Sequence, residues 1–167
     1  MPSPAGKKGI PPVVAGALVA VAAVLVVLVG SLAYGKMQDS ASEAARTDAL
    51  KVAEEQSVAM LAYDYGSVDE QLASAADGLT GDFREEYLSL MNNIIAPGAK
   101  EKQISVQVAV QGSSVVSAEP DRVVALLFLN QITTSSENPE AVSSGSRVRV
   151  ELENQDGRWL VSRLTPI

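Results

Sequence analysis

The sequence predicts an α+β fold, in which helices lie across one face of a four-stranded antiparallel sheet, preceded by one helix that spans a membrane. An uncharged apolar run lies near the N-terminus. In the next part of the chain, apolar residues recur with the roughly 3.6-residue period of a helix, and towards the C-terminus they alternate as in a strand. The chain has 167 residues, which suits one folded domain and a tail. Helices followed by a run of strands are typical of an α+β roll.

The composition excludes several kinds of chemistry. The chain contains no cysteine and no histidine, so thiolate nucleophiles, disulfides and the commonest general base and metal ligand are not available. Lys7 and Lys8 are the charged residues of the N-terminal tail, and from Gly35 onward 11 basic residues stand against 20 acidic ones, a net charge of about −9. Such a domain is a poor candidate for binding nucleic acid. We expect no nucleic-acid partner, no cofactor and no metal.

Residues 13–34 form an apolar segment without a charged side chain. As a helix rising about 1.5 Å per residue, they span about 33 Å, enough to cross a hydrocarbon core of roughly 30 Å. Lys7 and Lys8 precede the segment and the chain becomes acidic after it, which places the N-terminus in the cytoplasm. The predicted organisation is a basic cytoplasmic tail over 1–12, a transmembrane helix over 13–34, a helical stalk over 35–57 and a domain outside the plasma membrane over 58–167.

A cleaved secretory signal is the alternative interpretation of this segment. Ser31-Leu32-Ala33 has small residues at the positions that a signal peptidase prefers, so cleavage would follow Ala33. The apolar run is longer than the roughly 7 to 15 residues of a typical signal core, which favours an uncleaved anchor. Candidates for packing against another membrane helix are Gly16, Ala20 and Ala23, although small residues are frequent in such segments.

Helix signals follow the apolar segment. A helix is predicted over 36–61, and its alanine-rich first half has little apolar surface to bury, which favours a stalk that joins the domain near Val58. Ser67 and Glu70 match a capping box at the start of a short helix, which Gly78 would end in a left-handed conformation.

A further helix is predicted after Thr80, with acidic residues in its first turn and with Pro97 and Gly98 as its end. Its apolar positions repeat at helical spacing: Phe83, Tyr87, Leu90, Met91 and Ile94. We expect four aromatic residues of this part of the chain to lock the helices against the sheet: Tyr63, Tyr65, Phe83 and Tyr87.

Strand signals begin at Ile104. Apolar and polar residues alternate over 104–110, a short strand is predicted over 115–118, and the long apolar run within 122–134 suits a central strand covered on both faces. The side chains of Asn130 and Gln131 are expected to bond backbone groups at a strand end. Residues 147–153 alternate strictly, and Asp156-Gly157 is a tight turn that pairs them with the last strand.

This last pairing predicts a contact surface. It places Trp159 and Val161 on the helix-covered face and Leu160 and Leu164 on the opposite one, where they are candidates for exposed apolar contact with a partner. The preceding strand carries four charged residues on this same face: Arg147, Arg149, Glu151 and Glu153. We assign Arg147 and Arg149 to the contact surface together with the two leucines. An ionic ligand is conceivable there, but a solvated face with cross-strand partners such as Arg158 is more common.

Catalytic chemistry has little support. The grouped carboxylates are Asp64 with Asp69 and Glu70, and Asp82 with Glu85 and Glu86, which could form an acid/base pair or a hard-cation site. Most of them fall in first helical turns, where negative charge complements the backbone dipoles. The sequence has no phosphate loop, nucleophile elbow or dinucleotide fingerprint. We expect a protein that is not an enzyme.

Several segments of the chain resemble those of a known family. None of them is a specific motif alone, and the resemblance depends on their order behind one apolar helix. They are Ala62-Tyr63-Asp64-Tyr65, Leu79-Thr80-Gly81-Asp82-Phe83 with Tyr87, Ala96-Pro97, Phe128-Leu129-Asn130-Gln131, and Asp156-Gly157-Arg158-Trp159-Leu160-Val161-Ser162. Over nearly its whole length the chain resembles the Mce-associated membrane proteins of actinobacteria, which are accessory to the mammalian-cell-entry lipid import systems. The resemblance implies a nuclear-transport-factor-like or cystatin-like domain outside the plasma membrane, and it carries over no catalytic residues.

The resemblance implies a non-enzymatic accessory subunit whose outer domain contacts other envelope proteins, such as components of the Mce transporter. Two alternatives stay open: the roll could bind a lipid or another apolar ligand in a cavity, or the protein could be an assembly scaffold of a secretion system, as similar bitopic proteins with this roll are. An isomerase or dehydratase is least expected, because its acid/base pair would have to be built without histidine.

Overall fold

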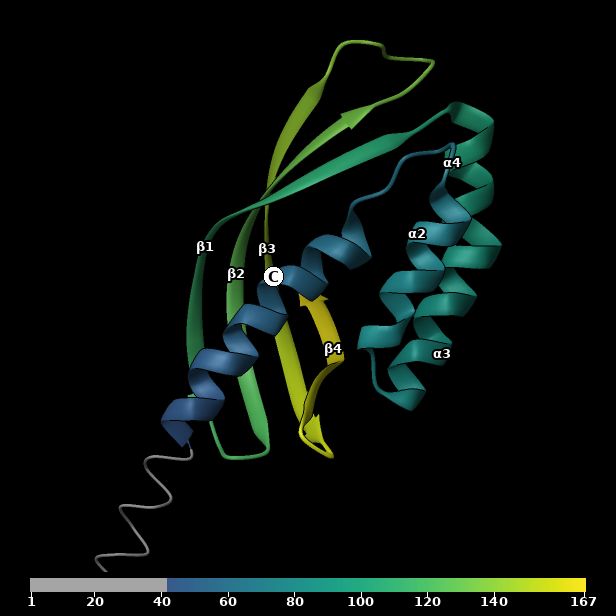
Figure 1. Cartoon of the computed structure of the whole chain (residues 1–167). Coiled ribbons are helices and arrows are strands. Elements are labelled where there is room, and N and C mark those ends of the chain that lie inside the picture. The colour runs from purple at the N-terminus through teal and green to yellow at the C-terminus, as the bar shows by residue number, and fades with distance from the viewer. Residues whose placement is uncertain (1–41) are drawn as a thin grey trace, which may run out of the picture. The chain divides into compact units, whose positions relative to one another are not determined.

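The computed structural model describes residues 42–167. The predicted tail, the transmembrane helix over 13–34, its candidate packing residues and the alternative cleavage site after Ala33 lie outside the described residues. Within residues 42–167, no helix is both long enough and apolar enough to cross a membrane. Figure 1 shows the described part, which belongs to one compact unit over Ala41–Ile167.

The first described helix runs over 42–61 and lies across one face of the sheet (Figure 1). Its buried positions recur every three or four residues and are mostly small: Ala45, Ala49, Ala53, Ser57 and Met60. Small side chains let the helix approach its neighbours closely, so that Ala49 and Ala53 are fully removed from solvent. The prediction that a stalk extends to residue 57 was wrong, because this helix packs into the domain from Ala45 onward.

The helix α2 (Val68–Ala75) follows and continues as the 3-10 turn η1 (Ala76–Gly78). The predicted capping box does not form, since the Ser67 side chain makes no hydrogen bond to the helix start. Gly78 was also predicted wrongly, because its φ is not positive. Gly78 instead allows a close approach: a Cβ at position 78 would lie 2.1 Å from Oε1 of Gln56, whose amide donates a hydrogen bond to the Ala75 carbonyl.

The next helix continues past its predicted end. It consists of α3 (Gly81–Leu90), the π-helical turn η2 (Met91–Ile95) and α4 (Ala96–Lys102). The prediction that Pro97 and Gly98 end the helix was wrong, because Pro97 falls in the first turn of α4. A proline is tolerated there, since the missing N–H would have no partner within the helix.

The π turn changes which apolar residues are buried. The buried positions of this helix are Tyr87, Met91, Ala96 and Ala99, with a five-residue step across the π turn. A regular helix would have continued the stripe at intervals of three and four residues. Ile94, which belongs to the predicted apolar stripe, is therefore 62% exposed. Leu90, also in that stripe, lies before the π turn and is 46% exposed.

The predicted antiparallel meander is confirmed. The strands β1 (Ser105–Ala118), β2 (Arg122–Thr134), β3 (Val142–Gln155) and β4 (Arg158–Pro166) pair in the order β1-β2-β3-β4. β1 unites the segments predicted over 104–110 and 115–118 into one strand, with register shifts before Gly112 and Ser117. Asp156 and Gly157 have φ angles of 52° and 84°, as the predicted tight hairpin turn requires.

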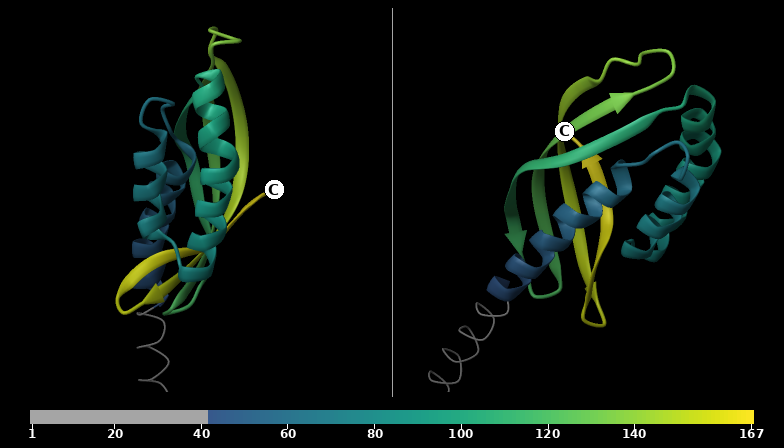
Figure 2. Two further views of the ribbon diagram at one scale, coloured as in Figure 1. Left: turned by 90° about the vertical axis from the view of Figure 1, so that its right-hand side faces the viewer. Right: turned by 45° about the horizontal axis from the view of Figure 1, so that its top comes forward.

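The core lies between the helices and one face of the sheet. Figures 1 and 2 show the helices gathered on one side of the curved sheet. The largest fully buried side chains come from three strands and α2: Leu127, Leu152, Val123, Val150, Val161 and Val68. The predicted inward placement of Val161 and Trp159 is confirmed, because Val161 pairs with Leu152 and both residues belong to or pack against this core.

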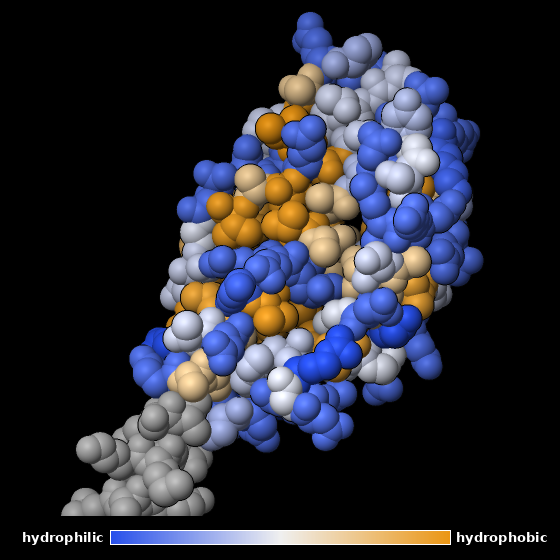
Figure 3. Space-filling view, viewed as in Figure 1, coloured by the Kyte–Doolittle hydropathy of each residue, from blue (hydrophilic) through white to orange (hydrophobic). Residues whose placement is uncertain are grey.

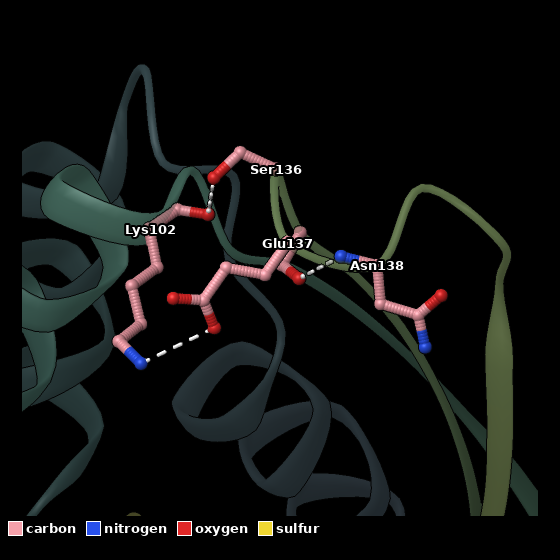
Figure 4. Close-up of polar contacts among 5 residues, drawn as sticks. Lys102, Ser136, Glu137 and Asn138 are labelled. Carbon is pink, nitrogen blue, oxygen red and sulfur yellow. Dashed lines mark hydrogen bonds and ion pairs between the residues drawn. The ribbon is translucent and has the colours of Figure 1, made fainter.

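The loop between β2 and β3 holds the end of α4 (Figure 4). The hydroxyl and the backbone N–H of Ser136 both donate hydrogen bonds to the Lys102 carbonyl, at 2.8 and 2.9 Å, and Lys102 Nζ lies 3.3 Å from Glu137. Because the last carbonyls of a helix have no partner within it, Ser136 satisfies one of them. The long β2–β3 hairpin is thereby fixed to the helical side of the domain.

Candidate partner-binding surface

The face of the sheet turned away from the helices, named here the outer sheet face, carries a row of apolar side chains on β2. Because side chains of a strand alternate, the odd-numbered residues of β2 enter the core and the even-numbered ones lie on this outer face. The row is Val124, Leu126, Phe128 and Ile132. Phe128 and Ile132 are 44% and 36% exposed. The prediction that β2 is covered on both faces was wrong for its second half, where Phe128 and Ile132 are exposed on a side without a helix of the described residues; Val124, near the start of the strand, is only 7% exposed.

The predicted charged row lies on the outer sheet face of β3. Arg149 Nε lies 3.6 Å from Glu151, and Arg122 of β2 lies 2.9 Å from Glu153. Arg158 is not their cross-strand partner, because its guanidinium donates a hydrogen bond to the carbonyl of Asp77, 3.3 Å away. Within residues 42–167, Arg147 forms no ion pair, although it stands opposite Phe128 in the β2–β3 register.

The two leucines predicted beside these arginines lie on different faces. Leu160 pairs with Glu153 and shares the outer sheet face. Leu164 pairs with Val150, a core residue, and packs against the core. The predicted placement of Leu164 was wrong because a register shift opposite Glu151 and Leu152 inserts one extra residue into β4, and every later side chain changes face.

Two more exposed apolar features were not predicted as contact residues. Ile167 is 60% exposed and its N–H donates to the Arg147 carbonyl at 3.0 Å. It borders a groove of about 480 Å³ that Phe128, Arg147 and Pro166 also line. On the opposite side of the domain, Leu90 and Ile94 stand one turn apart and form an exposed pair, named here the α3 ridge. Figure 3 has the view of Figure 1, with the helix over 42–61 in front of the sheet, and shows apolar residues reaching the surface in the middle of this helix-covered side.

The predicted aromatic lock is formed in part. The Tyr87 hydroxyl is buried and donates to the Met60 carbonyl at 3.1 Å, and burial raises the pKa of Tyr87 above its ordinary value. Tyr63 exchanges two backbone hydrogen bonds with Val106 at the free edge of β1, at 2.9 and 2.8 Å. Phe83 packs against the core. Tyr65 does not join the lock, because its side chain is 40% exposed.

The contact of Asn130 also differs from prediction. Asn130 does not bond backbone at a strand end but accepts a hydrogen bond from the Ser143 hydroxyl of β3 at 2.9 Å. Its side chain therefore links two strands across the outer sheet face.

The grouped carboxylates take part in local contacts. Asp69 pairs with Lys100 of α4. Asp64 accepts hydrogen bonds from the Ser105 hydroxyl at 2.7 Å and from the Gly66 N–H at 2.9 Å, and these two bonds lower the pKa of the Asp64 carboxyl. Within the described residues, no three acidic side chains converge as metal ligands would.

A groove of about 570 Å³ lies between the start of α3 and β4. Phe83 and Leu164 line it together with polar and charged side chains, among them Asp82, Glu86 and Arg163. Apolar ligands favour concave sites lined mainly by hydrophobic residues. This groove is therefore poorly matched to a lipid chain.

The fold defines the class of domain. An IcmL-like type IV secretion system protein from Legionella pneumophila superposes with a TM-score of 0.61 at 15% identity, over 73% of this chain and 93% of that one. The periplasmic domain of DotI gives 0.60 at 12% identity, over 71% and 91%. CagV, a VirB8 homologue from Helicobacter pylori, gives 0.54 at 8% identity, over 70% and 96%. The domain thus has the same kind of fold as VirB8 homologues, and the predicted α+β roll is confirmed.

The chain belongs to the family described as "Uncharacterized protein Rv1363c/MT1408-like", whose model matches residues 11–166. The Outer membrane protein Rv1973 of Mycobacterium tuberculosis is 40% identical over 134 residues, which cover 80% of this chain and 81% of that protein. The Uncharacterized protein Rv1362c of the same organism is 35% identical over 134 residues, which cover 80% of this chain and 60% of that protein.

Proposed function

We propose that this protein is a non-enzymatic accessory subunit of an Mce-type lipid import system, anchored in the plasma membrane by residues 13–34, with its roll domain outside. In this role the domain acts through contacts with other envelope proteins. The proposal includes no catalytic residue and no cofactor.

The distribution of apolar residues is the observation that supports action through protein contacts. The interior of the roll is filled by side chains such as Leu127, Leu152 and Val161, which are fully buried. Large apolar side chains nevertheless remain at the surface of the α3 ridge and of the outer sheet face. Exposed apolar groups on a well-packed domain are typical of protein-binding surfaces. A carrier of lipid would instead need an open apolar interior.

The chain's relatives support association with a membrane and a domain outside the cytoplasm. A relative at 40% identity is named an outer membrane protein, and two solved neighbours are a periplasmic domain of DotI and a periplasmic fragment of TraM. Lys7 and Lys8 before the apolar run at 13–34 favour the same orientation. The assignment to an Mce-type importer depends on the sequence resemblance alone.

A scaffold of a secretion system is the second candidate. The fold favours it, because solved domains with this roll include VirB8-type components of type IV secretion systems. Low sequence identity limits that likeness to the fold. Both candidates require protein partners and differ in which proteins these are.

The test is co-purification from the native membrane. Tagged full-length protein is isolated in mild detergent and its companions are identified by mass spectrometry, alongside a Leu90→Glu/Ile94→Glu variant of the α3 ridge. An Ala73→Glu variant adds the same kind of charge to an exposed position of α2 and is the control. We expect permease, ATPase or substrate-binding subunits of an importer with the wild type and the control, and at least tenfold less with the ridge variant.

Each other outcome changes the conclusion. Secretion components in place of importer subunits would move the scaffold to first place. Recovery of lipid without any specific protein would refute both candidates and favour a carrier.

A further inference from the structure

We propose that the outer sheet face binds the same face of a second copy of this chain. The two sheets would pack face to face around a two-fold axis that runs across the strands at the level of Val150. This inference names a partner for the outer sheet face and is independent of the importer assigned above.

The charged row of β3 is self-complementary under this operation. Along the outer sheet face it reads Arg147, Arg149, Glu151 and Glu153, with two positive charges followed by two negative ones. A two-fold axis at position 150 reverses the strand direction in the second copy. Arg147 then lies opposite Glu153 of the second copy, and Arg149 lies opposite Glu151. Opposite charges facing each other stabilise an interface and select its register.

The same axis matches the apolar row of β2. Ala125 pairs with Val150, so the axis crosses β2 at Ala125. Leu126, which is partly exposed, then faces Val124 of the second copy, which is 7% exposed. Phe128 lies level with Arg147, and Arg122 lies level with Glu153. Phe128 therefore faces the guanidinium of Arg122 in the second copy, an arrangement that favours cation–π attraction.

The outer-face residues of β4 also face complementary residues of the second copy under this axis. The register shift in β4 is necessary for this arrangement. Leu160 is level with Glu153, and Ile167 is bonded to Arg147. The axis therefore places Leu160 opposite Ile167 of the second copy, so that two partly exposed apolar groups cover each other. Without the extra residue in β4, Pro166 in place of Ile167 would lie level with Arg147, and Leu164 would turn from the core to the outer sheet face.

The alternative two-fold axis, parallel to the strands, is disfavoured by charge. It would place the β3 rows of the two copies parallel, so that Arg147 faces Arg147 and Arg149 faces Arg149. Like charges in direct opposition are destabilising. Of these two axes, when each passes over β3, the one across the strands pairs the row favourably.

Chain direction agrees with the chosen axis. The first described turns of the helix over 42–61 lie beside β1, where Arg46, Leu50 and Glu54 line a groove with Ser114 and Val115. An axis that runs from β1 to β4 keeps the β1 edges of both copies on the same side. The first described turns of the helix over 42–61 then lie on that same side in both copies.

The absence of cysteine from the chain allows a direct test. Leu126→Cys places one thiol next to the axis on the outer sheet face, and Glu85→Cys places one on α3. Full-length variants in native membranes are treated with a bis-maleimide whose arm spans about 10 Å, the spacing of packed sheets. We expect a crosslinked dimer from Leu126→Cys at least tenfold more abundant than from Glu85→Cys. Equal yields would overturn the proposal.

Charge reversal then tests the register. Arg147 and Glu153 are six residues apart on one strand, about 20 Å, so they cannot pair within one chain. In the Leu126→Cys background, Arg147→Glu is expected to lower crosslinking at least fivefold, and Arg147→Glu/Glu153→Arg is expected to restore it to within twofold. Lys51→Glu makes the same charge change on the helix side and should have no effect.

Folding is monitored by the fluorescence of Trp159, the single tryptophan, which packs against the core. If the double reversal keeps the native fluorescence and fails to restore crosslinking, the proposed axis is wrong. If the α3 ridge variant loses the importer subunits while its crosslinking is unchanged, the α3 ridge and the outer sheet face bind different partners.

Discussion

The hydroxyl of Tyr87 connects two helices, and its removal is a sharp test of the packing. Met60 lies in the last turn of the helix over 42–61, where carbonyl groups have no partner within the helix. The Tyr87 hydroxyl of α3 donates to the Met60 carbonyl at 3.1 Å, and Met60 is 3% exposed. Tyr87→Phe keeps the ring and leaves a buried acceptor without a donor. Such an unsatisfied group costs about 1 to 3 kcal/mol.

We therefore expect Tyr87→Phe to lower the free energy of unfolding by about 1 to 3 kcal/mol. The measurement is urea unfolding of the full-length chain in mild detergent, followed by the fluorescence of Trp159. Tyr65→Phe is the matched control, because Tyr65 is 40% exposed, and a surface change of this kind stays within about 0.5 kcal/mol. Equal effects of the two substitutions would refute the capping role of Tyr87.

The pH dependence of this stability gives a second readout. Burial raises the pKa of Tyr87 in the folded state above its value in the unfolded chain, which is about 10. The unfolded state therefore loses its proton first, and the contribution of Tyr87 is complete below pH 10 and declines as the pH rises further. The wild type should lose more stability than Tyr87→Phe between about pH 10 and 12. Parallel curves would contradict this reasoning.

Three further predictions concern the core, a close approach and a loop. Leu127→Ala should destabilise the domain by about 2 to 5 kcal/mol, because Leu127 is fully buried on β2; a loss under about 1 kcal/mol in urea unfolding would show that the core collapses around the change. Gly78→Ala should cost about 1 kcal/mol by displacing the Gln56 amide from its hydrogen bond, and this cost should vanish in a Gln56→Ala background in a double-mutant cycle. Asp64→Asn should destabilise the domain at pH 7. The folded pKa of Asp64 is lowered by the Ser105 and Gly66 bonds, so the wild type holds this contribution above its unfolded pKa of about 3.9 and loses it as the pH falls; a difference that persists undiminished at pH 2 would exclude the carboxylate as its source.

Most of the strand architecture could be predicted from the sequence. The alternation of Val148, Val150 and Leu152 with charged residues specifies which side of β3 is buried, because side chains of a strand alternate between faces. Asp156-Gly157 specifies the hairpin, because both positions must adopt positive φ. These signals are local, and each is complete within a few residues of the chain.

The features that the sequence did not predict depend on packing between distant segments. The burial of Ala49 and Ala53 could not be predicted from their modest hydrophobicity, because it follows from the close approach of the helix to its neighbours. Gly78 was assigned to a left-handed turn because glycine is common in such turns. Its actual constraint is the close approach of Gln56, which belongs to another helix and cannot be recognised from the local sequence.

The candidate contact surface shows the same division. Leu160, Arg147 and Arg149 were placed correctly on the outer sheet face, because strict alternation fixes the side of a strand on which a residue lies. Leu164 and Ile94 were misplaced, because a bulge and a π turn each alter the repeat without a sequence signature of their own. The sequence by itself determined the order, type and pairing of the strands through local periodicity. Only the tertiary structure decided where that periodicity is interrupted, and therefore which apolar side chains remain at the surface for a partner.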